Sequence, residues 1–370
     1  AVLQRAQHVR PGEVPAVRPP ELLVDQSPQL TDSHSETVSY DFEVLGILAG
    51  MELITTTSVP TSPARVDEPS APPLRIGVVQ HHWREDADEL RAVLSEAIGQ
   101  AAEAGATAVF LPELTLSRYP ADTLPEGTPS ATAEDLETGP TITFAREAAK
   151  AHDVYVHASL YEKADQGDGL GFNTAVLVAP DGTLVARTRK THIPVTAGYY
   201  EDKYFRPGPP EDAYPVVDVP GQDVRLGLPT CWDEWFPEVA RLYAIGGADV
   251  LVYPTAIGSE PDHPEFDTQP LWQHTIVGHA IANGLFVVAP NRTGTEGLIT
   301  FYGTSFVADP YGRILVQAPR ETEAVLVTDL DLSQRKDWLD LFPFLATRRP
   351  DSYAALSEPV RPEHQRQVSE

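Results

Sequence analysis

Short apolar runs alternate with longer segments of helical periodicity along the chain from residue 74 onwards. Short runs rich in valine, isoleucine and leucine are typical of buried strands, whereas apolar positions that recur every three to four residues are typical of helices covering a sheet. The pattern predicts strands over residues 74–79, 108–111, 154–160, 174–178, 184–187, 224–228, 250–253, 286–289, 305–308 and 324–328. It predicts helices over residues 86–104, 141–152, 238–245 and 271–283.

Strands that alternate with helices in this way indicate an α/β fold. The tripeptides Pro180-Asp181-Gly182 and Pro310-Tyr311-Gly312 are typical of tight turns, so they predict hairpins within the same region. The number and spacing of these elements favour one large domain with a mixed sheet rather than two small domains.

Residues 1–73 differ in composition from the rest of the chain, because they hold 10 of its 35 prolines and 10 acidic residues against 4 basic ones. The low-complexity stretch 55–63 is typical of a linker, and the apolar island 40–49 of a short docking segment. We therefore expect a flexible extension over 1–73, a globular domain over 74–353 and a tail over 354–370. Translation from Met51, and removal of an initiator methionine before Ala1, both fit the sequence.

Charge and cysteine content restrict the partners of the protein. Asp and Glu number 54 against 27 Lys and Arg, a formal net charge of −27, which argues against general electrostatic binding to nucleic acid or to an anionic membrane. No apolar run approaches the ~18 residues that span a bilayer. One cysteine allows no internal disulfide, so a cytoplasmic location is expected.

Three reactive side chains each lie shortly after a predicted strand: Glu113, Lys190 and Cys231. A carboxylate at such a position can act as a general base, and a lysine can stabilise an oxyanion. The segment around Cys231 runs from strand to turn to helix, as in the elbow that exposes a nucleophile. Taken singly, each residue also fits an ordinary loop, surface or core position. The histidines show no metal-ligand spacing, and His192 is interpreted as a structural hydrogen-bonding residue.

Taken together, in this chain order, the three segments resemble the nitrilase, or carbon–nitrogen hydrolase, superfamily over residues 74–353. The resemblance is greatest to the branch that acts on N-carbamoyl amines. The residues that carry it are the stretches 231–238, 253–261, 278–280, 291–292 and 301–303.

The resemblance implies a four-layer α-β-β-α sandwich that forms a homodimer or a larger homo-oligomer. It implies that Cys231 is the nucleophile, Glu113 the general base and acid, and Lys190 the oxyanion partner, with Glu201 matching a second glutamate that positions the reacting groups. The cysteine would form a thioester intermediate, with no metal and no cofactor.

The same resemblance implies N-carbamoylputrescine as the first candidate substrate. Its ammonium needs a carboxylate or aromatic partner, for which Glu260 is the candidate, with Tyr119 and Trp232 lining the site. An N-carbamoyl amino acid would instead need an arginine, and Arg206 and Arg292 are available. Two further alternatives remain: a nitrilase or aliphatic amidase using the same residues, and a non-catalytic protein that recruits a partner through 40–49.

Overall fold

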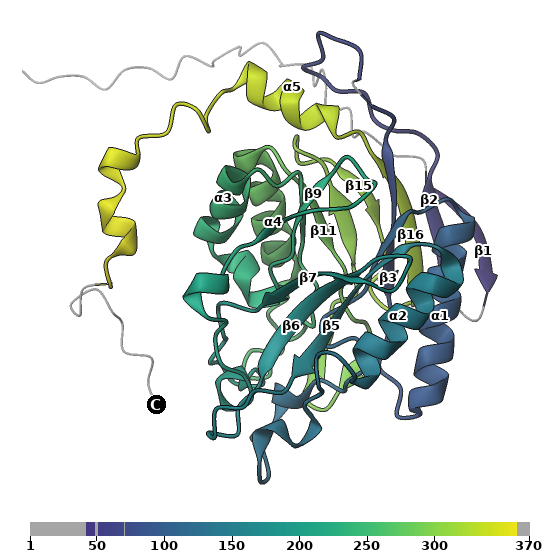
Figure 1. Ribbon diagram of the computed structural model, residues 1–370, viewed down its shortest axis with the longest axis vertical. Helices are drawn as coiled ribbons and strands as arrows, with labels where there is room; N and C mark the ends of the chain where they lie inside the picture. The colour runs from purple at the N-terminus through teal and green to yellow at the C-terminus, as the bar shows by residue number, and fades with distance from the viewer. Residues whose placement is uncertain (1–41, 49–50, 70, 361–370) are drawn as a thin grey trace, which may run out of the picture. The chain divides into compact units, whose positions relative to one another are not determined.

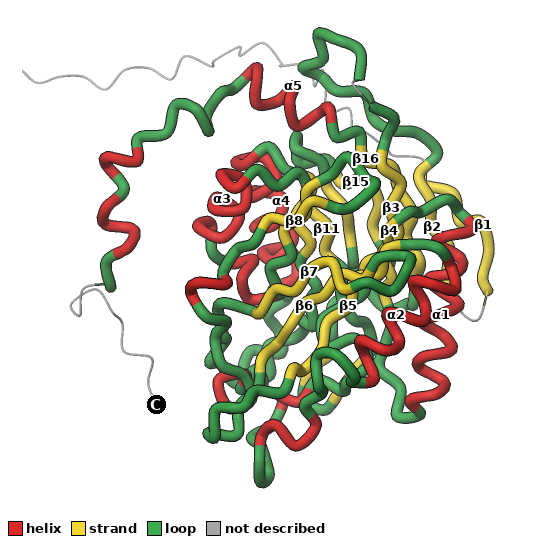
Figure 2. The backbone as a smooth tube through the Cα atoms, viewed as in Figure 1, coloured by secondary structure: helices red, strands yellow, loops and turns green. Residues whose placement is uncertain are grey.

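The computed structural model of the protein describes residues 42–48, 51–69 and 71–360. Within these ranges the fold is built on two large sheets and five α-helices (Figures 1 and 2). The eight-stranded sheet holds, in spatial order, β1 (Phe42–Leu48), β2 (Met51–Thr56), β16 (Ala324–Leu330), β3 (Leu74–Gln80), β4 (Ala108–Phe110), β5 (Tyr155–Glu162), β6 (Phe172–Val178) and β7 (Leu184–Arg189). The six-stranded sheet holds β15 (Ile314–Gln317), β14 (Phe306–Ala308), β11 (Phe286–Ala289), β10 (Val250–Val252), β9 (Arg225–Gly227) and β8 (Val216–Asp218).

The remaining elements are helices, one small hairpin and short turns. The helices are α1 (Ala87–Glu103), α2 (Pro140–His152), α3 (Pro237–Gly246), α4 (Gln269–Asn283) and α5 (Ser333–Leu341). A small hairpin joins β12 (Thr295–Glu296) to β13 (Ile299–Thr300). Short 3₁₀ turns are η1 (Pro120–Asp122), η2 (Pro129–Thr132), η3 (Glu201–Lys203), η4 (Pro210–Asp212), η5 (Cys231–Trp235), η6 (Pro350–Ser352) and η7 (Ala354–Ser357).

Local sequence explains where the first helix lies and which face it buries. The carboxylate of Asp86 accepts hydrogen bonds from the backbone N–H groups of Asp88 and Glu89, which satisfies donors that the first helical turn leaves free. The helix α1 then buries a stripe with helical spacing against the eight-stranded sheet, made up of Leu90, Leu94, Ala97, Ile98 and Ala101.

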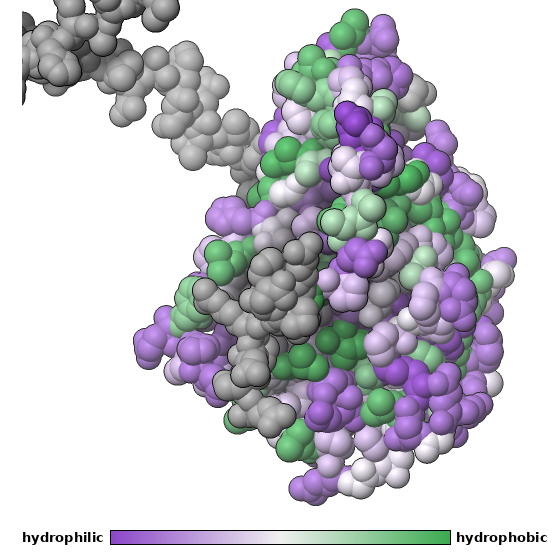
Figure 3. All heavy atoms as spheres, turned by 90° about the vertical axis from the view of Figure 1, so that its left-hand side faces the viewer, coloured by the Kyte–Doolittle hydropathy of each residue, from purple (hydrophilic) through white to green (hydrophobic). Residues whose placement is uncertain are grey.

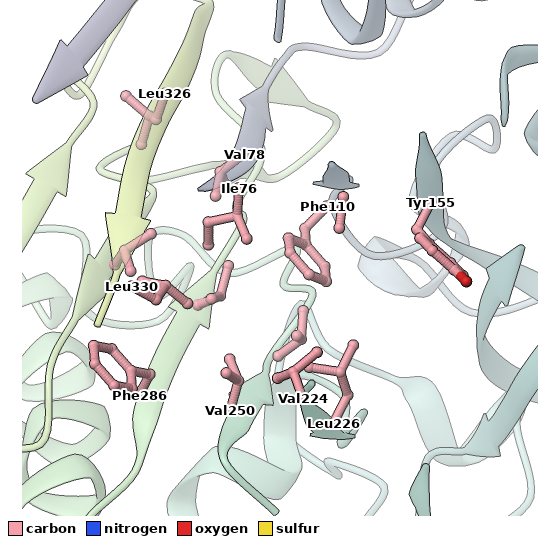
Figure 4. Close-up of a cluster of buried hydrophobic side chains, with 14 of the residues drawn as sticks. Ile76, Val78, Phe110, Tyr155, Val224, Leu226, Val250, Phe286, Leu326 and Leu330 are labelled. Atoms are coloured by element: carbon pink, nitrogen blue, oxygen red, sulfur yellow. The ribbon is translucent and has the colours of Figure 1, made fainter. Parts of the chain in front are cut away.

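Three apolar layers hold the sheets and helices together. One lies between the two sheets, where side chains such as Phe110, Leu226 and Phe286 pack face to face (Figure 4). A second lies between the eight-stranded sheet and α1 with α2, and a third between the six-stranded sheet and α3 with α4. This arrangement confirms the predicted four-layer α-β-β-α sandwich.

The region before residue 74 contributes two strands to the eight-stranded sheet. Thr55 and Thr56, which the sequence assigned to a linker, lie in β2, and this strand pairs in parallel with β16. Residues 42–48 of the apolar island form β1, which pairs with β2 at the sheet edge. The expected boundary at residue 74 therefore separates strands that the structure joins in one sheet. Residues 1–41, 49, 50 and 70 of the extension and residues 361–370 of the tail lie outside the described residues.

Two further features concern the helices and the surface that they form. None of the described helices is both long enough and apolar enough to cross a membrane. On the side of the molecule where α3 lies, apolar side chains are interspersed with hydrophilic ones (Figure 3). Several large apolar side chains of α3 and α4 are exposed, namely Leu242, Ile245, Leu271 and Ile281.

Truncation tests whether β2 belongs to the domain. A chain that begins at Leu74 should be less stable than one that begins at Met51 by about 3–6 kcal/mol, because it loses the buried apolar side chains of Met51 and Ile54. Urea unfolding followed by circular dichroism measures the difference. Equal free energies of unfolding for the two chains would show that β2 adds nothing to the sheet.

Candidate active site

Cys231 lies on a sharp turn between β9 and α3. Its backbone has φ of +41°, in the left-handed region that is uncommon for residues other than glycine. The backbone N–H of Cys231 donates to the Pro254 carbonyl at 3.0 Å, which ties the turn to the end of the neighbouring strand β10. A strained backbone held in this way at the start of a 3₁₀ turn fits the predicted nucleophile elbow.

Glu113 follows β4 and is completely buried. One of its carboxylate oxygens, Oε1, accepts hydrogen bonds from Asn173 Nδ2 at 2.7 Å and from Lys190 Nζ at 2.9 Å. The other, Oε2, accepts from the backbone N–H of Ala256 at 2.8 Å. Both oxygens are therefore held in place by donors from separate strands, which fixes the direction in which the carboxylate points.

Lys190 follows β7 and lies between two carboxylates. Its ammonium donates to Glu113 Oε1 and, at 2.7 Å, to Glu201 Oε2, while the other oxygen of Glu201 accepts from the hydroxyl of Tyr119 at 2.9 Å. All of these side chains are buried. Burial alone lowers the pKa of Lys190, but the charges of Glu113 and Glu201 outweigh it and hold that pKa well above its ordinary value. The lysine is therefore a fixed positive charge.

The same environment acts on Glu201 and on the thiol. Burial raises the pKa of Glu201 to about 7, although the Lys190 ammonium opposes this shift. Burial also raises the pKa of Cys231 well above its ordinary value, the charge of Glu113 raises it further, and the charge of Lys190 lowers it. The resting cysteine is thus a protonated thiol, and it needs a base to become a nucleophile. Four of the predicted site residues therefore form one electrostatic cluster.

A cavity of about 200 Å³ opens onto the thiol. Its lining includes Cys231 together with Pro194, Thr196, Tyr199, Glu201, Trp232, Trp235, Ile257, Glu260, Thr268 and Leu271. The charged side chains in this lining are two carboxylates, and among the described residues that form it none is lysine or arginine. Glu260 is half-buried, its Oε1 accepts from the Thr268 hydroxyl at 3.3 Å, and burial raises its pKa.

Three residues considered for substrate binding lie elsewhere. Tyr119, predicted to line the site, is completely buried outside this lining, where it supports Glu201 through its hydroxyl. Arg206 pairs with Asp168 on the surface. Arg292 is buried and donates to the carbonyl of Glu113 at 3.0 Å. The structure therefore gives Tyr119 and Arg292 supporting positions around the two glutamates and places Arg206 away from the cavity.

The sequence analysis missed several residues that shape the site. Asn173, which orients Glu113, stands directly before a predicted strand, and a polar residue next to a buried run was the signal available. Trp235 lies within the stretch 231–238, but the pattern does not distinguish it from Trp232. Leu271 begins a predicted helix as one apolar residue among many. These positions follow from how the chain folds back on itself rather than from local sequence.

Comparison with known proteins shows which family the chain resembles in sequence and in structure. Residues 75–339 match the family described as carbon-nitrogen hydrolase. A carbon-nitrogen hydrolase from Helicobacter pylori G27 has a similar structure, with a TM-score of 0.69 and 32% identity, covering 77% of this chain and 99% of the other.

Two curated relatives are also similar in sequence. An N-carbamoylputrescine amidase from Arabidopsis thaliana is 38% identical over 232 residues, which is 60% of this chain and 75% of the relative. A citrullinase from Francisella tularensis subsp. tularensis is 34% identical over 285 residues, 76% of this chain and 96% of the relative.

The sandwich fold and the family match together define a hydrolase that acts on carbon–nitrogen bonds. The family match covers most of the described chain. The chain belongs to the carbon–nitrogen hydrolase family, within the nitrilase superfamily.

The protonation of Glu201 should make the activity depend on pH. Since its pKa is about 7, it takes up a proton as the pH falls through neutrality and then no longer offers Lys190 a second negative charge. We expect kcat/KM to fall about tenfold for each pH unit below 7. In Glu201→Gln the rate should be lower and this acidic limb should be absent. Initial rates of hydrolysis by both proteins between pH 5.5 and 8.5 test this. An identical acidic limb in the variant would show that Glu201 is not the group that titrates.

Proposed function

We propose that the protein hydrolyses an N-carbamoyl amine, with N-carbamoylputrescine as the first candidate, through a thioester on Cys231. The observation that carries the proposal is the charge of the cavity, whose charged lining side chains are the carboxylates of Glu201 and Glu260. The Lys190 ammonium already pairs with Glu201, so Glu260 is the lining carboxylate that is available to a cation. A carboxylate in a cavity that opens onto a thiol suits a substrate with a scissile ureido group at one end and an ammonium at the other. The similarity to an N-carbamoylputrescine amidase supports the same choice.

The first half of the reaction makes the thioester. Glu113 takes the proton of Cys231, and the sulfur attacks the ureido carbonyl to form a new C–S bond. The oxyanion of the tetrahedral intermediate is stabilised by the Lys190 ammonium and by the backbone N–H of Trp232. A donor of this kind is worth about 3–4 kcal/mol in comparable enzymes. Glu113 then gives its proton to the departing nitrogen as the C–N bond breaks.

The second half releases the product and restores the enzyme. Glu113 takes a proton from water, the resulting hydroxide attacks the thioester carbonyl, and the C–S bond breaks with return of the proton to sulfur. The acid released is a carbamic acid, which loses carbon dioxide as its remaining C–N bond breaks. For N-carbamoylputrescine the final products are therefore putrescine, carbon dioxide and ammonia. The same glutamate therefore serves as base and acid in both halves, which its fixed position next to Lys190 makes possible.

Glu260 is the proposed partner of the distal ammonium. It lines the same cavity as Cys231, and the aromatic residues Tyr199, Trp232 and Trp235 also belong to this lining. Aromatic faces attract cations, and the attraction adds to that of the carboxylate. Burial raises the pKa of Glu260, so the unliganded carboxyl is a weaker acid than usual, and a bound ammonium would favour its ionised form.

Substrates with a carboxylate are less well matched. An N-carbamoyl amino acid needs a cationic partner, and both candidate arginines are already occupied, Arg206 with Asp168 and Arg292 with Glu296. Citrulline is the second candidate, because the similarity to a citrullinase extends over 96% of that protein. Its ammonium suits Glu260, whereas its carboxylate finds no lysine or arginine among the described residues of the lining. A nitrile substrate, a homo-oligomeric assembly and a cytoplasmic location stay predictions.

A substrate panel with one variant tests the proposal. Wild-type protein should release ammonia from N-carbamoylputrescine faster than from citrulline, N-carbamoyl-β-alanine or a nitrile. In Glu260→Gln, kcat/KM for N-carbamoylputrescine should fall about 100-fold, because a charge-assisted contact worth about 2–3 kcal/mol is lost. Butylurea, which lacks the ammonium, should be hydrolysed equally by both proteins.

Two controls make the result interpretable. Glu265→Gln removes an exposed carboxylate from the same loop and should leave kcat/KM unchanged. Cys231→Ala sets the background rate of ammonia release. Preference for the anionic substrate, or an equal loss on butylurea in Glu260→Gln, would overturn the assignment of Glu260, and full activity in Cys231→Ala would exclude thiol chemistry.

A further inference from the structure

Asp233, two residues after the proposed nucleophile, accepts hydrogen bonds from both sides of the site. Its buried carboxylate accepts from the backbone N–H of Thr230 at 3.1 Å, on the nucleophile elbow. It also accepts from the backbone N–H groups of His192 at 2.9 Å and of Thr191 at 3.4 Å, which directly follow Lys190. One side chain therefore bridges the segment that carries the sulfur and the segment that carries the ammonium.

This bridge spans the two sheets. Lys190 follows β7 at the edge of the eight-stranded sheet, whereas Cys231 follows β9 of the six-stranded sheet. The backbone of Lys190 is held within its own half of the fold, because its N–H donates to the Asn173 carbonyl at 2.8 Å. Its distance from the sulfur thus depends on the contacts that join the two strand ends. Asp233 supplies two of them, with the backbone N–H groups of Thr191 and His192, while its bond to the Thr230 N–H fixes the carboxylate within the elbow.

His192 strengthens the bridge with two contacts of its own. Its Nδ1–H donates to Asp233 Oδ1 at 2.7 Å. Its ring stacks on that of Phe236, with centroids 3.7 Å apart and planes 14° from parallel. Phe236 ends the elbow and precedes α3. His192 therefore contacts the elbow at two places, the carboxylate of Asp233 and the ring of Phe236.

We propose that Asp233 and His192 are positioning residues, which set the place of the Lys190 ammonium relative to the sulfur of Cys231. The inference rests on the proposed function, in which that ammonium stabilises the oxyanion. A shift of the lysine segment weakens the interaction only when the oxyanion forms, so kcat suffers more than KM. It also removes positive charge from the vicinity of the thiol, which makes the thiolate harder to form.

Variants of His192 test the proposal, because its side chain is 27% exposed and a substitution there is compatible with folding. His192→Phe keeps the aromatic stacking and removes the donor to Asp233. His192→Asn restores a donor close to the position of Nδ1 and removes the ring. His82→Phe is the matched control, since it breaks another histidine–carboxylate pair, His82 Nδ1 with Glu323 Oε1 at 3.2 Å, outside the cavity lining.

Two measurements are made on each protein, and only variants with the same melting temperature as the wild type are compared. The first is kcat and KM for N-carbamoylputrescine. The second is the pH dependence of alkylation by iodoacetamide, which reports on Cys231 alone because the chain has one cysteine. In His192→Phe we expect kcat to fall about tenfold with KM little changed, since small displacements of a catalytic group are costly. We expect alkylation to require higher pH, and His192→Asn to recover most of both losses.

Other results overturn the proposal. Wild-type kcat and alkylation in His192→Phe would show that the bridge does not position the lysine. The same losses in His82→Phe would show a general structural effect. If the wild-type protein hydrolyses no carbamoyl amine, the proposed function fails, yet the alkylation profiles still decide whether Asp233 and His192 control the charge around Cys231.

Discussion

The contact between Lys190 and its two buried carboxylates is the interaction on which the site depends. Three charged groups lie out of water, and removing one partner from such a buried set typically costs about 3–5 kcal/mol. Each carboxylate is held by a further donor, Asn173 and the Ala256 N–H for Glu113, and the Tyr119 hydroxyl for Glu201. These donors make it possible for the ammonium to stay charged and fixed where no solvent reaches it.

The fold brings this contact to the nucleophile elbow by placing the ends of two sheets together. Glu113 and Lys190 follow strands of the eight-stranded sheet, whereas Cys231 and Ala256 follow adjacent strands of the six-stranded sheet. The bond from the Ala256 N–H to Glu113 joins the two halves directly, and the bridge through Asp233 joins them a second time. The apolar layer between the sheets sets their spacing, so the core and the chemistry are parts of one arrangement.

The local sequence predicts the elements whose hydrophobic pattern is contained within a few neighbouring residues. Periodicity located ten strands, but not β1, β2, β8 and β15 of the two large sheets. Residues at strand ends made Glu113, Lys190 and Cys231 candidates, since loops after buried strands commonly carry reactive groups. The sequence pattern misassigned Thr55 and Thr56, whose β-branched side chains suit a strand, because β2 pairs with β16 from the far end of the chain. The prediction that Tyr119 lines the cavity was wrong. An aromatic residue near a site can either line the cavity or hold a catalytic side chain from behind, and the sequence does not distinguish these two positions.

In the proposed mechanism Cys231 carries the acyl group during turnover. The most direct test of this step is intact-protein mass spectrometry of the acid-quenched reaction with N-carbamoylputrescine, followed by peptide mapping. We predict a transient mass increase, equal to the acyl group, on the peptide that contains Cys231. Steady hydrolysis with no adduct on that peptide, or with the adduct on another residue, would contradict it.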